Sequence, residues 1–142
     1  MGGLYLAEIS KEATVILKIL QKEGIDYELE YRFRDPLVSR YRFDFAIFDE
    51  NKQIKCLLEY DSVLHFKETG LHHGRVAFTK AQERDRVKNQ FCLRNKIPLY
   101  RIPYWALKDI HTFADCLNPK FLVTSKWHND RINPYLRRKD NV

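Results

Sequence analysis

Residues 40 to 61, "RYRFDFAIFDENKQIKCLLEYD", contain two apolar stretches separated by turn-forming residues. The alternation along 40–49 predicts a strand, with Tyr41, Phe43, Phe45 and Ile47 on one face and Arg42, Asp44, Ala46 and Phe48 on the other. Residues 53–61 then return as a more apolar strand, which is expected to be central in the sheet. A hairpin that turns at Glu50 and Asn51 would pair Asp44 with Leu57 and place it diagonally across from Glu59.

Helical and strand-like patterns flank this hairpin. Apolar residues at helical spacing follow Ser10, a candidate N-cap, and the pattern stops at Gly24. Further elements are expected at 25–33 (strand), 76–95 (helix), 97–103 (strand) and 108–117 (helix). The order α-β-β-β-α-β-α predicts an α/β fold, a mixed β-sheet flanked by helices.

Composition limits the class of protein. The 142 residues are 44% hydrophobic and 13% aromatic, which predicts one globular domain over 1–125 followed by a basic tail, 126–142. No apolar run approaches the roughly 18 residues that a membrane span needs. Three cysteines fit neither a disulfide framework nor a zinc ribbon, so reduced thiols in the cytoplasm are expected. The net charge of +6 favours a polyanionic partner.

Acidic side chains gather where an apolar strand ends. Glu59 and Asp61 share a face of their strand, and the expected pairing brings Asp44 within reach of them. Three carboxylates packed together without a counter-charge would repel one another. A hard divalent cation, Mg²⁺ or Mn²⁺, removes that cost and suits phosphodiester cleavage. The pattern therefore predicts a metal site of these three acids, with His65 as a general base or acid.

Salt bridges are the alternative explanation for the acids. Arginines at several positions could neutralise them without any metal: Arg40, Arg42, Arg84, Arg86 and Arg101. Such pairs are common on strands and would make the acidic positions purely structural.

Three stretches in this order, "RFDFAIF", "LLEYDSVLHF" and "QERDRVKNQFCLRNKIPLYRIPYW", resemble the small endonucleases of the PD-(D/E)XK superfamily. The resemblance is to the branch related to very-short-patch repair nucleases and to phage and homing endonucleases, and it extends from about Ser10 to Trp105. It implies a restriction-endonuclease-like fold and a metal-dependent DNA endonuclease. The matching site positions are Asp44, Glu59, Asp61, His65, Glu12 and Lys88.

The chain departs from the pattern of this branch at three positions. Ser62 stands where a glycine is usual, and Leu64 replaces the usual glutamine. Asp61 occupies the place of the lysine in the superfamily's name. The resemblance then implies that the metal, His65 or Lys88 stabilises the charge on the substrate.

Basic residues are candidates for contacts with DNA phosphates. In the expected helix these are Arg84 and Lys88, and in the tail they are Arg131, Arg137, Arg138 and Lys139. The alternatives are pairs within the helix and a solvated chain end.

The sequence thus predicts a DNA endonuclease that needs Mg²⁺ or Mn²⁺, in the cytoplasm of a bacterium or a phage-infected cell. A phage or mobile-element (homing) enzyme, a mismatch or branched-junction nuclease and a restriction-type enzyme all remain open. The alternative is a catalytically silent nucleic-acid-binding module of a larger complex. Double-strand cutting by one chain with one site requires a homodimer or sequential nicks, and both remain open.

Overall fold

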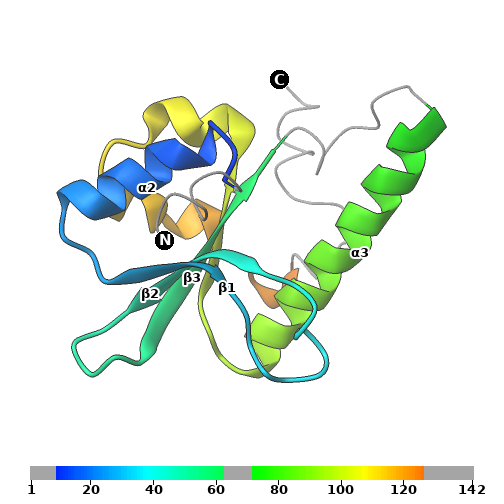
Figure 1. Ribbon diagram of the computed structural model, residues 1–142, viewed down its shortest axis with the longest axis horizontal. Helices are drawn as coiled ribbons and strands as arrows, with labels where there is room; N and C mark the ends of the chain where they lie inside the picture. The colour runs from blue at the N-terminus through cyan, green and yellow to red at the C-terminus, as the bar shows by residue number, and fades with distance from the viewer. Residues whose placement is uncertain (1–8, 63–71, 127–142) are drawn as a thin grey trace.

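The fold is a four-stranded sheet with helices on both faces (Figure 1). It is seen in a computed structural model that describes residues 9–62 and 72–126. The strand order is β1-β2-β3-β4, with antiparallel pairs β1–β2 and β2–β3 and a parallel pair β3–β4. The predicted mixed α/β sheet and its element order are confirmed.

Helices and strands follow the predicted order along the chain. Their bounds are α2 Ala13–Lys22, β1 Tyr27–Tyr31, β2 Phe43–Phe48, β3 Ile54–Asp61, α3 His72–Arg94, β4 Leu99–Pro103, η2 Tyr104–Asp109, α4 Phe113–Cys116 and η3 Pro119–Phe121. The single helix expected at 108–117 is wrong. The chain is extended at Ile110, and Thr112 begins the separate helix α4 with a capping box to Asp115.

Helix α2 ends before Gly24, as the sequence indicated, but it begins two residues later than a Ser10 N-cap predicts, with Glu12 at the N-cap position. The hydroxyl of Ser10 accepts a hydrogen bond from the backbone N–H of Ala13 at 3.1 Å. Gly24 ends the helix with a φ of 68°, a left-handed conformation that favours glycine. The buried face of α2 includes Ile16 and Leu20, which attach the helix to the sheet.

Two apolar cores lie on opposite faces of the sheet. The first packs under α2 and α4 and includes Leu20, Phe45 and Leu58. The second packs under α3 and includes Leu57 and Phe91. Figure 1 shows α2 and α3 on either side of the strands, so that β3 contributes side chains to both cores.

Strands β1 and β2 change face together at Glu30. Leu29 and its partner Phe45 pack in the first core, whereas Tyr31 and its partner Phe43 pack in the second. Glu30, between them, has a φ of 53°, which interrupts the regular alternation of the strand. The predicted alignment of Phe43 with Phe45 on one face is therefore wrong.

The β2–β3 hairpin has a different register from the one predicted. Its turn spans Asp49 to Gln53, with a hydrogen bond from the Lys52 N–H to the Asp49 carbonyl at 3.0 Å. Lys52 adopts a left-handed φ of 63° in this turn. The pairing of β2 with β3 also has a bulge between Ile47 and Phe48, next to the turn.

The shifted register changes the partner of Asp44. Phe45 pairs with Leu58, so continuation of the ladder places Asp44 opposite Glu59 rather than opposite Leu57. The shift in register therefore brings Asp44 nearer to Glu59 than the predicted diagonal arrangement would.

The path from β3 to β4 places α3 over the acidic end of the sheet. Parallel strands need a long crossover, and the chain makes it through α3.

No helix within 9–62 and 72–126 is both long and apolar enough to span a membrane.

Candidate functional site

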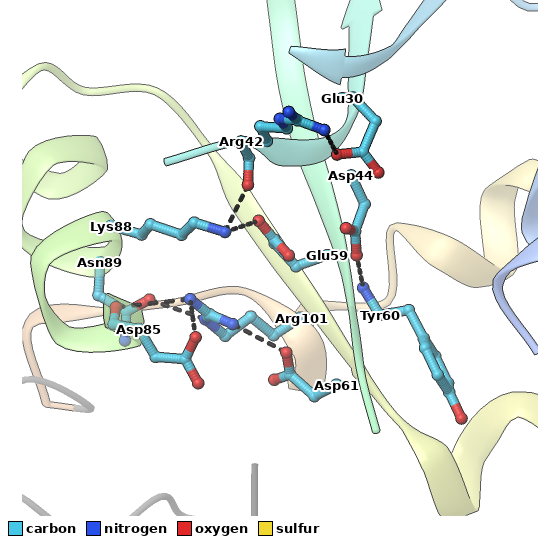
Figure 2. Close-up of polar contacts among 10 residues, drawn as sticks. All are labelled: Glu30, Arg42, Asp44, Glu59, Tyr60, Asp61, Asp85, Lys88, Asn89 and Arg101. Atoms are coloured by element: carbon cyan, nitrogen blue, oxygen red, sulfur yellow. Dashed lines mark hydrogen bonds and ion pairs between the residues drawn. The ribbon is translucent and has the colours of Figure 1, made fainter. Parts of the chain in front are cut away.

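Asp44 lies at the point where β2 separates from β3. The β2–β3 pairs end at Phe45–Leu58, and the backbone N–H of Tyr60 lies two residues further along β3. It donates a hydrogen bond to Oδ2 of Asp44 at 2.8 Å (Figure 2). The Asp44 carboxylate thus takes the place of a strand carbonyl and is fixed between the two strands.

Glu59 extends from β3 toward α3, where it meets Lys88. The Lys88 ammonium lies 2.7 Å from Oε1 of Glu59, and both side chains are buried. The same ammonium donates to the carbonyl of Arg42 at 2.6 Å and lies 5.1 Å from the centre of the Phe43 ring. These contacts hold a cation beside the carboxyl pair, the name used below for Asp44 and Glu59.

Burial raises the pKa of Asp44 well above its ordinary value of 3.8, and the charge of Glu59 raises it further. A hydrogen bond between these two carboxyl groups acts in the same direction, whereas Lys88 and the N–H of Tyr60 lower the pKa. A hydrogen bond between carboxyl groups needs a proton on one of them. The carboxyl pair therefore retains a proton at a pH where an exposed aspartate has lost it.

Asp61 belongs to a second group of contacts, centred on Arg101. The Arg101 guanidinium donates to Oδ1 of Asp61 at 2.8 Å and to Oδ1 of Asn89 at 2.8 Å. It also lies 3.5 Å from the carboxylate of Asp85. Burial alone would lower the pKa of Arg101, but the charges of Asp85, Asp61 and Glu59 raise it overall. Arg101, Asp61, Asp85 and Asn89 are termed the arginine cluster below.

The arginine cluster joins β3, β4 and α3 beside the carboxyl pair. Figure 2 shows the Arg101 side chain between Asp61 and the helix residues Asp85 and Asn89, while Lys88 points to Glu59. Asp61 thus has the kind of arginine partner that the salt-bridge alternative expected. The structure brings Asp44 and Glu59 together, but it directs Asp61 to a cation of the protein itself.

Other predicted site residues differ in their placement. Glu12 is exposed near the start of α2, and its charge is one of the causes that raise the pKa of Tyr60, after burial. Arg84 is half-buried on α3, one turn before Lys88. The predictions for His65 and for the tail residues Arg131, Arg137, Arg138 and Lys139 lie outside the described residues.

A pocket of about 210 Å³ adjoins Asp44. Its lining comes from the start of α2, from β1 and β2 and from the end of β3, and it includes Ser10, Glu30, Asp44, Tyr60 and Ser62. Glu30 was not predicted as a site residue. No sequence signal marks it, since a glutamate on a strand gives no hint of the left-handed φ that turns the strand here.

The carboxyl pair supplies the type of oxygen ligand that Mg²⁺ or Mn²⁺ prefers. Such an ion usually takes one or two carboxylates and completes its shell with waters and substrate phosphate oxygens. The raised pKa of Asp44 fits this use, because a cation would relieve the repulsion that favours the proton. No group of three or more Asp, Glu, His or Cys that could hold a metal is found in the described ranges.

The three cysteines are poor candidates for nucleophiles. Cys56, Cys92 and Cys116 are buried and free, and burial raises the pKa of each thiol to about 12. A nucleophilic cysteine needs a thiolate near neutral pH. These side chains fill the core, as their apolar neighbours do.

A known protein family matches most of the chain that forms this fold. No curated protein and no solved structure matches the chain. One family model matches residues 10–120, from the start of α2 through the arginine cluster to η3. The chain therefore belongs to the family described as "Protein of unknown function (DUF2726)".

Proposed function

We propose that the protein is a metal-dependent DNA endonuclease that hydrolyses phosphodiester bonds. The observation that carries the proposal is the carboxyl pair itself: Asp44 and Glu59 face each other across two strands, with the Lys88 ammonium 2.7 Å from Glu59. Two carboxylates and the Lys88 ammonium at the end of a sheet agree with what the sequence resemblance to PD-(D/E)XK nucleases implies. This fold would then be restriction-endonuclease-like.

Each residue of the site has a distinct role in the proposed reaction. Asp44 and Glu59 would hold Mg²⁺ or Mn²⁺, and the ion would stabilise the negative charge that builds up on the phosphate oxygens. Lys88 keeps a positive charge beside Glu59 and can stabilise the same phosphate. In the superfamily pattern a lysine stands on the strand, at the position that Asp61 occupies here. Lys88, on α3, would supply that positive charge instead.

Asp61 acts as a positioning residue in this proposal. Its contact with Arg101 fixes the end of β3 to α3, the helix that carries Lys88. Glu59 is also paired with a cation, Lys88, but it lies beside Asp44, which lines the pocket, whereas Asp61 is not among the residues that line this pocket. We therefore assign the metal to Asp44 and Glu59 and not to Asp61.

Metal dependence is the direct test of the proposed reaction. The wild-type protein should nick supercoiled plasmid DNA in Mg²⁺ or Mn²⁺ and should not do so in EDTA. Glu59→Gln should lose the activity, whereas Glu50→Gln, at an exposed turn position, should retain it. Binding of DNA without cleavage in every metal would refute the enzyme and favour the silent binding module.

His65 remains the proposed general acid or base. A group in this role contributes about 10² to 10⁴ in rate, so His65→Ala should slow cleavage by that factor and leave DNA binding intact. The pH–rate profile should also lose its histidine limb. A profile identical to that of the wild type would assign His65 a structural role.

The proposal also includes the setting in which the enzyme acts. The substrate is DNA in the cytoplasm of a bacterium or a phage-infected cell, where buried free thiols remain reduced. Double-strand cutting would be carried out by a homodimer or by sequential nicks. A mass measurement in solution, together with the ratio of nicked to linear product, distinguishes these two.

A further inference from the structure

The segment that joins β1 to β2 carries a dense positive charge. Residues 32–42, termed the arginine loop below, read "RFRDPLVSRYR" and contain four arginines, whereas Asp35 is their only acid. The arginines are Arg32, Arg34, Arg40 and Arg42, and all four are exposed. The DNA contacts expected from sequence lie on α3 and in the tail, and this loop is a separate surface.

Buried contacts hold the arginine loop in one conformation. Val38 is fully buried in the second core, and the Phe33 ring packs on the Phe91 ring of α3 with 4.9 Å between centroids. The Asp35 carboxylate accepts a hydrogen bond from the Leu37 N–H at 2.9 Å, which closes a local turn. Because its backbone is fixed, the loop would lose little conformational freedom on binding a partner.

Among the residues that the structure describes, three of the four arginines form no ion pair. Arg42 lies 3.8 Å from Glu30, but within the described part of the chain Arg32, Arg34 and Arg40 make no ion pair. Arg40 lies over the Tyr41 ring at 5.0 Å and donates to its hydroxyl at 2.9 Å, so its guanidinium is oriented without being neutralised. Guanidinium groups of this kind suit phosphate oxygens, which they can bind in pairs.

The arginine loop is joined directly to the candidate site. The Arg42 carbonyl accepts the hydrogen bond from Lys88, and Asp44 follows two residues later on β2. In Figure 2, Arg42, which directly precedes β2, lies above the Lys88–Glu59 contact. A polyanion that lies along the loop can therefore continue to the carboxyl pair.

We propose that the arginine loop is a surface that binds the phosphate backbone of duplex DNA and delivers it to the carboxyl pair. The inference rests on the proposed function in one respect, which is that the polyanion is duplex DNA. Arg32, Arg34 and Arg40 make the phosphate contacts, and Arg42 links the loop to the site. Such contacts set the position of the DNA and carry no base sequence.

Salt dependence tests the phosphate contacts separately from cleavage. The triple variant Arg32→Ala/Arg34→Ala/Arg40→Ala should bind a short fluorescent duplex more weakly than the wild type in EDTA. Each lost contact should reduce the slope of log K against log salt by about 0.9, hence by up to about 2.7 for three. Replacement of the same residues with Lys should restore the slope, since the charges return.

A matched control removes the same charge from elsewhere on the surface. Lys18→Ala/Lys22→Ala/Lys108→Ala also lowers the net charge from +6 to +3, at exposed positions on α2 and η2. This control should keep the wild-type slope. Equal slopes for the loop variant and the wild type, or equal losses in the loop variant and the control, would overturn the inference. Thermal melts of all proteins confirm that each is folded.

The two proposals can fail independently. If the wild type cleaves DNA in Mg²⁺ but the loop variant keeps its salt slope, the nuclease stands and the arginine loop does not. If the wild type never cleaves but the loop variant loses slope, the loop stands as a DNA-binding surface and the nuclease fails. A wild type that binds no duplex at low salt overturns the loop directly.

Discussion

Replacement of Asp44 by Asn should abolish cleavage and, at neutral pH, make the protein more stable. Asn keeps an oxygen that can accept the hydrogen bond from the Tyr60 N–H, so the backbone contact is retained. The substitution removes the negative charge of the Asp44 carboxylate, which burial and the charge of Glu59 disfavour. A ligand of a catalytic metal contributes several kcal/mol to the transition state, so cleavage should fall by about 10² to 10⁴ or more.

The gain in stability should depend on pH in a defined direction. The folded protein holds the proton of Asp44 more tightly than the unfolded chain does, because its pKa is raised. The wild type therefore loses stability as pH rises from the ordinary pKa of 3.8 through the pKa of the folded state. Asn has no proton to lose, so the stability difference should be absent at low pH, grow across this interval and then remain constant.

Urea unfolding of Asp44→Asn and the wild type at several pH values measures this difference. Asp109→Asn is the matched control, since Asp109 is exposed and lies away from the site on η2. It should change neither cleavage nor the pH dependence of stability. A variant of Asp44 that cuts at the wild-type rate would remove this residue from the proposed active site.

Replacement of Arg101 by Met should be among the most destabilising single changes in the chain. Arg101 is 1% exposed, and its removal would leave the buried Asp61 and the half-buried Asp85 without this cation. Breaking a buried pair in this way costs about 3 to 5 kcal/mol. For a domain of this size the melting temperature should fall on the order of 10 °C, as calorimetry would show.

The double variant Asp61→Leu/Arg101→Met distinguishes lost pairing from lost packing. Replacing both partners with apolar residues removes the uncompensated charge, so the double variant should recover part of the stability lost in Arg101→Met. Asp85 would still lack its cation, so recovery should be incomplete. If the double variant is less stable than Arg101→Met, the guanidinium contributes chiefly by filling space.

The regular elements could be predicted from sequence, but their register could not. Alternating and helical spacing located the hairpin and α3 because the cores impose these patterns. The turn was misplaced since Lys52 adopts a left-handed conformation that glycine or asparagine usually provides. The bulge after Ile47 shifted the register again, and no residue type marks it.

The site was predictable in its residue types and less so in its contacts. The acids at 44, 59 and 61 stood out because carboxylates are rare among buried strand residues. Strand geometry places Glu59 and Asp61 on one face, but it cannot show that the guanidinium of Arg101, on β4, donates to Asp61 while Lys88 binds Glu59. The cation at each acid comes from a later part of the chain, beyond the range of local patterns.

The parallel pairing of β3 with β4 also determines the order in which the site can form. The β2–β3 hairpin closes a short turn, so it can form early and places Glu59 and Asp61 on a strand without their cations. Glu59 meets Lys88 only after a separation of 29 residues, and Asp61 meets Arg101 after 40. During synthesis the nascent hairpin therefore carries unneutralised acids until α3 and β4 have left the ribosome. Packing of α3 then supplies Lys88 to Glu59, and addition of β4 supplies Arg101 to Asp61, which completes the second charge pair.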